Sequence, residues 1–144
     1  MTNLVEYMLA EHEYCNDLFC DGENLATESK WSELKSVFEK FVMETEKHFA
    51  KEEKVLFPHA EQSMGSDAGP TAVMRMEHEQ MRALIGNLKP LIEKENKEGF
   101  LGETETLLVL MQQHNMKEEQ ILYPMIDRMV GANLAAVIDA MEAL

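Results

Sequence analysis

The chain has 144 residues, 45% of them hydrophobic, which suits one domain with a single buried core. Its formal net charge is -14 and its sequence pI is ≈ 4.7. Such a surface repels phosphate backbones and anionic lipids, so neither nucleic acid nor a membrane is expected as a partner. The N-terminus has no basic region and Glu6 interrupts its apolar residues, so we expect no signal sequence and a cytoplasmic location.

Helix-forming residues dominate the sequence, and β-branched runs are missing. Clusters of Gly, Pro, Ser and polar residues predict breaks at 27–30, 63–70 and 95–102. The predicted helices are therefore 4–27, 30–62, 70–95 and 102–130, followed by a short one at 133–143. This pattern predicts an all-α protein, an antiparallel up-down-up-down four-helix bundle with a short C-terminal helix.

Two segments of the chain are near copies, 66 residues apart. HFAKEEKVLFP occupies 48–58 and HNMKEEQILYP occupies 114–124, while EHE occurs at both 11–13 and 77–79. We interpret the repeat as a tandem duplication. Residues 1–144 would then form a single domain of two helical hairpins, about 1–65 and 66–131, plus the helix at 133–143.

The repeat also predicts the positions of four histidines along the bundle axis. They are His12, His48, His78 and His114. The midpoints between successive histidines are residues 30, 63 and 96, which fall in or beside the predicted breaks. Because each helical residue advances the same 1.5 Å, antiparallel neighbours then carry their histidines at one level. All four also lie on apolar stripes, so we expect one buried layer of imidazoles.

Two carboxylates join this layer. Glu52 follows His48, and Glu118 follows His114, one helical turn along the same face. On the last long helix this face is expected to continue through Ile121. One His–Glu pair can satisfy itself by hydrogen bonding, but six such groups in one core require a compensating cation. Imidazole with carboxylate suits iron, manganese, zinc or copper, and six ligands suit two ions with an oxo or hydroxo bridge.

Other glutamates near the layer are weaker candidates for a role at the metal site. Glu53 and Glu119 point off the core face and are expected in solvent. The glutamates beside the histidines either orient the imidazoles or form a solvated face, and we favour the solvated face for Glu11, Glu13, Glu77 and Glu79.

Four further residues are not expected to bind metal. His59 is expected at the surface. Tyr123 is expected to pack where Pro124 kinks the helix. Cys15 and Cys20 are too far apart along a helix for a disulfide and are expected as free thiols.

The segments that carry these residues resemble the haemerythrin family, in its HHE cation-binding branch. They are AEHEYCN, HFAKEEKVLFP, MEHEQMR and HNMKEEQILYP, and the resemblance extends over residues 4–130. It implies a non-haem di-iron centre in a four-helix bundle, although zinc or manganese stays open. The implied ligands are His12, His48, Glu52, His78, His114 and Glu118, the two glutamates bridging the ions.

Two departures from the oxygen-carrying branch bear on function. Met74 stands where that branch has a fifth histidine, and Glu118 at i+4, with Glu119 beside it, replaces an aspartate at i+5. The ligand set thus resembles members that handle nitric oxide or repair iron–sulfur centres. We expect non-enzymatic binding of O2 or NO for sensing, storage or detoxification. The alternatives are a di-iron oxidoreductase that reduces NO or peroxide with an external electron donor, and an iron donor; the oligomeric state stays open.

Overall fold

The computed structural model describes residues 3–66 and 68–144, and its regular structure is entirely helical. The elements are α1 (Leu4–Thr27), α2 (Trp31–Lys51), η1 (Glu52–Leu56), α3 (Phe57–Met64), α4 (Pro70–Glu93), α5 (Lys97–Lys117), η2 (Glu118–Leu122), α6 (Tyr123–Val130), η3 (Gly131–Asn133) and α7 (Leu134–Glu142). The all-α prediction is confirmed.

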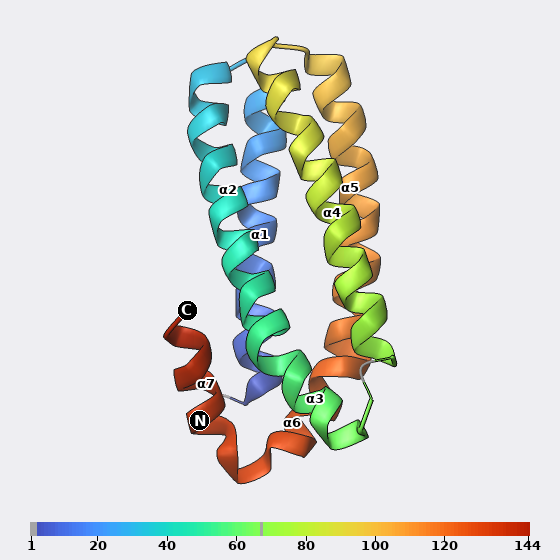
Figure 1. The fold of residues 1–144 in the computed structure, drawn as a ribbon. Coiled ribbons are helices and arrows are strands. Elements are labelled where there is room, and N and C mark those ends of the chain that lie inside the picture. The colour runs from blue at the N-terminus through green and yellow to red at the C-terminus, as the bar shows by residue number, and fades with distance from the viewer. Residues whose placement is uncertain (1–2, 67) are drawn as a thin grey trace.

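Four long helical columns lie side by side (Figure 1). α1 packs on α2 and on α5, and α4 packs on α5 and on α2, so each column has two neighbours. The colour gradient shows that each column runs back along the one before it. α7 folds against η1 and α6 at the lower end of the bundle, where Val137 and Met141 are buried.

The predicted start of the fourth column is wrong by five residues. The predicted break at 95–102 includes Gly99 and Gly102, but α5 already begins at Lys97. The Asn96 side chain accepts a hydrogen bond from the Gly99 backbone N–H at 2.9 Å, which caps the helix. This cap, together with the burial of Phe100 in the first turns of α5, offsets the low helix propensity of the two glycines.

Two apolar clusters hold the columns together, one on each side of the histidine layer. The first, toward the upper loops, includes Phe19, Leu34, Phe41, Leu88, Phe100 and Leu107. The second, toward the chain termini, includes Leu4, Met8, Phe57, Met74, Tyr123 and Ile126. Burial of apolar surface is the dominant favourable term in folding, so these two clusters fix the helices on both sides of the polar layer.

Both hairpins contain a π-helical turn directly after a histidine-bearing helix, at η1 and η2. A π-turn holds one more residue than an α-turn, so the residues that follow rotate back by about 100°. The expectation for Ile121 is therefore wrong: its side chain is 63% exposed, and Leu122 is buried instead.

The first π-turn leaves one backbone carbonyl without its helical donor, because Pro58 has no N–H to donate to the Glu53 carbonyl. This carbonyl instead accepts a hydrogen bond from Arg75 Nη2 at 3.2 Å.

One helical stretch, Lys97–Glu142, contains a window apolar enough to cross a membrane by length and composition, with a mean hydropathy of 1.3. The stretch is bent at Gly131, whose φ of 52° is left-handed. It also contributes buried residues such as Leu107 and Leu122 to both apolar clusters. We therefore assign it to the bundle.

Both cysteines are free, as predicted, and they differ in accessibility. Cys20 is exposed, whereas Cys15 is buried, and burial raises the pKa of its thiol to about 11. At pH 8 only about one Cys15 in a thousand would be the reactive thiolate. A thiol-reactive disulfide should therefore label one cysteine in the native protein and two in denaturant. Cys20→Ser should abolish the native reaction, and two rapidly reacting native thiols would contradict the structure.

Candidate metal centre

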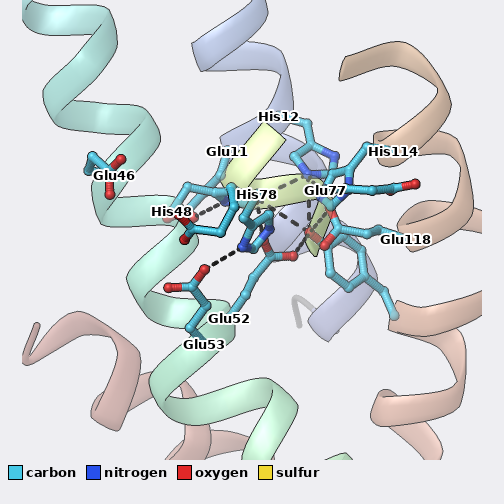
Figure 2. Close-up of polar contacts among 12 residues, drawn as sticks. Glu11, His12, Glu46, His48, Glu52, Glu53, Glu77, His78, His114 and Glu118 are labelled. Carbon is cyan, nitrogen blue, oxygen red and sulfur yellow. Dashed lines mark hydrogen bonds and ion pairs between the residues drawn. The ribbon is translucent and has the colours of Figure 1, made fainter. Parts of the chain in front are cut away.

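The six predicted ligand side chains meet in one buried layer (Figure 2). Each long column contributes one imidazole, and the two π-turns contribute the carboxylates. The side chains of Glu52 and Glu118 are 0% exposed, and those of the four histidines are 6% exposed or less. Six ionisable groups thus share an interior that is shielded from bulk solvent.

The side chains fall into two groups, each able to hold a metal ion. Ligand atoms within 4.8 Å of one another define the sets Glu52, His78, His114, Glu118 and His12, His48, Glu118. In the second group, the Nε2 atoms of His12 and His48 are 3.0 Å apart. The repeat alone allows His12 to share an ion with His48 or with His114. The structure groups the histidines within each hairpin, and Glu118 belongs to both groups.

The outer nitrogen of every imidazole is held by a second carboxylate. The Nδ1 atoms lie 2.6 to 2.8 Å from glutamate oxygens in the pairs His12–Glu119, His48–Glu11, His78–Glu53 and His114–Glu77. An ionised carboxylate can only accept, so Nδ1 must carry the proton. The lone pair of each neutral ring is then on Nε2, which faces the centre of the bundle.

These contacts correct four expectations. Glu53 and Glu119 are not free in solvent, and Glu11 and Glu77 do not form a solvated face. Each lies about 100° from the core stripe of its own helix, at the seam with a neighbouring column, where it reaches the outer edge of that column's imidazole. Glu13 is exposed, as expected for a solvated residue.

Three basic side chains stabilise the ionised form of three of the outer carboxylates, Glu11, Glu53 and Glu77. Lys51 contacts Glu11, Lys117 contacts Glu77, and Arg82 donates to both oxygens of Glu53 at 3.0 and 3.1 Å. Burial alone would raise the pKa values of these glutamates. The hydrogen bonds and positive charges outweigh burial and lower them.

Several inward atoms of the layer have no hydrogen-bond partner among the described residues, namely Glu52 Oε1, His78 Nε2, His114 Nε2 and Glu118 Oε2. His78 Nε2 lies 3.1 Å from Glu52 Oε1, and His114 Nε2 lies 3.2 Å from Glu118 Oε1. With the protons on Nδ1, these are pairs of acceptors that face each other. Buried unpaired acceptors are costly, and a cation between them removes the cost.

Protons compete for the same atoms. Burial and the charge of Glu118 raise the pKa of Glu52, so this carboxyl binds a proton more readily than an exposed glutamate. Burial alone would lower the pKa of His114, but its hydrogen bond and charge interaction with Glu118 raise it to about 9. A metal that binds here must displace such protons, as metal ligands usually require.

The sequence did not identify Tyr123 as part of the layer. Its side chain is 0% exposed, and its hydroxyl donates to Glu52 Oε2 at 2.6 Å and lies 3.0 Å from Glu118 Oε1. Burial and the two carboxylates raise the pKa of this phenol well above its usual value. The signal in the sequence was the one polar difference between the copies LYP and LFP, which matches Tyr123 to Phe57.

The surroundings of the two histidine pairs differ. Phe49 stacks on His78 with ring centroids 3.9 Å apart and an interplanar angle of 14°. Beside the other pair lies a cavity of about 20 Å³, lined by residues that include His12, Cys15, Asn16, Thr45, His48 and Asn115. A much larger groove of about 530 Å³, around Trp31 and Ile92, is lined by none of the six side chains.

The family model of the haemerythrin HHE cation-binding domain matches residues 3–126. The chain therefore belongs to the haemerythrin family, in which this domain binds cations. No curated protein and no solved structure matches the chain.

The hydrogen bond from His12 to Glu119 should matter to metal affinity. Glu119→Ala removes the acceptor that fixes the ring and its tautomer, so the dissociation constant for Fe(II) should rise about 10- to 100-fold. Glu13→Ala, an exposed glutamate next to His12, is the matched control. Anaerobic titration with Fe(II) measures both variants, and equal affinities would show that the contact has no orienting role.

Proposed function

We propose that this protein binds two iron ions through His12, His48, Glu52, His78, His114 and Glu118, and uses them to bind O2 or NO. The facing acceptor atoms of the layer carry the proposal, because a cation is the simplest partner for all of them. The mixture of imidazole and carboxylate suits iron, and also zinc or manganese.

The charges around the layer favour cations. Once a metal has displaced the protons of the layer, the four imidazoles would be neutral and both inner glutamates ionised, so two inner and four outer carboxylates would face three basic side chains among the described residues. The surplus of negative charge offsets the cost of bringing two divalent ions into the interior. Because Glu118 belongs to both ligand groups, it is the carboxylate best placed to bridge the ions.

The size of the site favours a diatomic ligand. An iron pair supplies the redox-active place where O2 or NO can be held, and the protein limits what reaches it. The cavity of about 20 Å³ beside His12 and His48 holds little more than one water molecule. Larger organic substrates are excluded by the apolar packing above and below the layer.

The metal assignment predicts a clear mutational contrast. Purified protein reconstituted with iron should contain two iron ions per chain by elemental analysis, and His48→Ala should lower that content. His59→Ala provides the control, because His59 is an exposed histidine eleven residues further along the same column. Equal iron content in both variants, or preferential retention of zinc or manganese, would contradict the di-iron assignment.

The ligand assignment can be tested separately. Anaerobic Fe(II)-loaded protein should change its visible spectrum on addition of one equivalent of NO or O2, and His48→Ala should weaken the change. Imidazole, which is too large for the cavity, should produce none. Sustained consumption of NO or peroxide with an added reductant would instead support the oxidoreductase alternative, and rapid loss of iron to an acceptor would support the iron donor. A cytoplasmic location, with an external electron donor, stays a prediction.

A further inference from the structure

We propose that the phenol oxygen of Tyr123 is an additional ligand of the ion held by His12 and His48, so that the two ions of the centre are chemically unequal. The inference rests on the proposed metal centre, but it concerns a residue outside the six ligands that the repeat and the family predict. It is carried by the position of one buried oxygen atom among the donor atoms of that ion.

The distances around Tyr123 Oη are those between ligands of a single ion. The oxygen lies 3.1 Å from His12 Nε2, 3.4 Å from His48 Nε2 and 3.0 Å from Glu118 Oε1. Donors about 2.0 to 2.2 Å from one metal, at angles near 90° to 110°, are about 2.8 to 3.6 Å apart. His12 Nε2 shows the same spacing to His48 Nε2, 3.0 Å, and to Glu118 Oε1, 3.2 Å.

The two ligand groups are unequal without this oxygen. The group around His78 has two imidazoles and two carboxylates, whereas the group around His12 has two imidazoles and only one carboxylate. Tyr123 Oη makes the second group four-membered. An anionic oxygen donor also suits ferric iron, as the tyrosine ligand of some haem proteins illustrates.

The π-turn is what brings Tyr123 to this place. In an unbroken α-helix a residue five positions after Glu118 would point about 140° away from it. With η2 in between, Tyr123 Oη lies 3.0 Å from the Glu118 carboxylate. The equivalent turn in the first hairpin places Phe57 beside His78, with ring centroids 5.7 Å apart. The equivalent π-turns thus place a phenol oxygen beside the ligand group of one ion and an apolar ring beside that of the other.

The proton balance of the step is simple. The metal–oxygen bond replaces the O–H bond of the phenol, and the proton that Tyr123 now shares with Glu52 leaves to solvent. No electron is transferred. A metal ion commonly deprotonates a ligand in this way when it binds a water molecule or a thiol.

The test uses the ferric protein and does not depend on gas binding. Phenolate bound to Fe(III) gives a charge-transfer band in the visible region and enhances tyrosine ring modes in resonance Raman spectra. We expect both features in the wild-type protein and neither in Tyr123→Phe. The ring of Phe57 is fully buried at the equivalent position, so phenylalanine fits a site of this kind.

Tyr14→Phe is the matched control, since Tyr14 is 42% exposed on α1 and contributes to neither ligand group. It should keep both spectral features. If Tyr123→Phe does not fold, deuteration of the tyrosine rings in the wild-type protein must shift the enhanced Raman modes.

The outcomes separate this inference from the proposed function. Iron-loaded wild-type protein without phenolate features, or a Tyr123→Phe variant that keeps them, overturns the assignment of Tyr123 and leaves the di-iron centre intact. A wild-type protein that retains no iron overturns both, and elemental analysis distinguishes that result from the first.

Discussion

The hydrogen bond between imidazole Nδ1 and an outer carboxylate is the interaction on which the centre depends. It occurs four times, on all four columns, and in each case it fixes both the ring orientation and the proton. With the proton outside, each Nε2 presents a lone pair to the interior. There it meets other lone pairs on Glu52 and Glu118. An apolar core cannot satisfy this arrangement, so the outer ring makes the layer costly unless a cation occupies it.

The bundle tolerates such a layer because the apolar packing that stabilises the fold lies at other levels along the bundle axis than the polar layer. Apolar clusters on both sides of the histidines bury aromatic and aliphatic side chains from every column. A folded scaffold can therefore hold unpaired acceptors in place before any cation binds, and protons partly neutralise them, as the raised pKa values of His114 and Glu52 indicate. Cation binding should then stabilise the native state by a free energy that grows with the logarithm of the cation concentration divided by the dissociation constant.

The sequence predicted what depends on repetition and on single-helix periodicity. The 66-residue offset gave the duplication, the loop midpoints gave one layer, and the i+4 spacing gave Glu52 and Glu118. The sequence could not predict contacts that depend on a neighbouring helix or on a change from α-helix to π-helix. Glu53 was misplaced because its partner, His78, lies on another column. Ile121 was misplaced because the periodicity assumed an unbroken α-helix through η2.

The differences between the two copies gather around one histidine pair. Beside His12 and His48 lie Tyr123 and Asn115, whose repeat partners Phe57 and Phe49 pack on His78. Cys15 and Thr45 on the same side likewise correspond to methionines in the second hairpin. A symmetric duplication gives two equal ions, and equal ions offer no preference for where a ligand binds. The polar substitutions would remove that equivalence, leaving one ion enclosed by aromatic rings and the other open to a small, partly polar cavity.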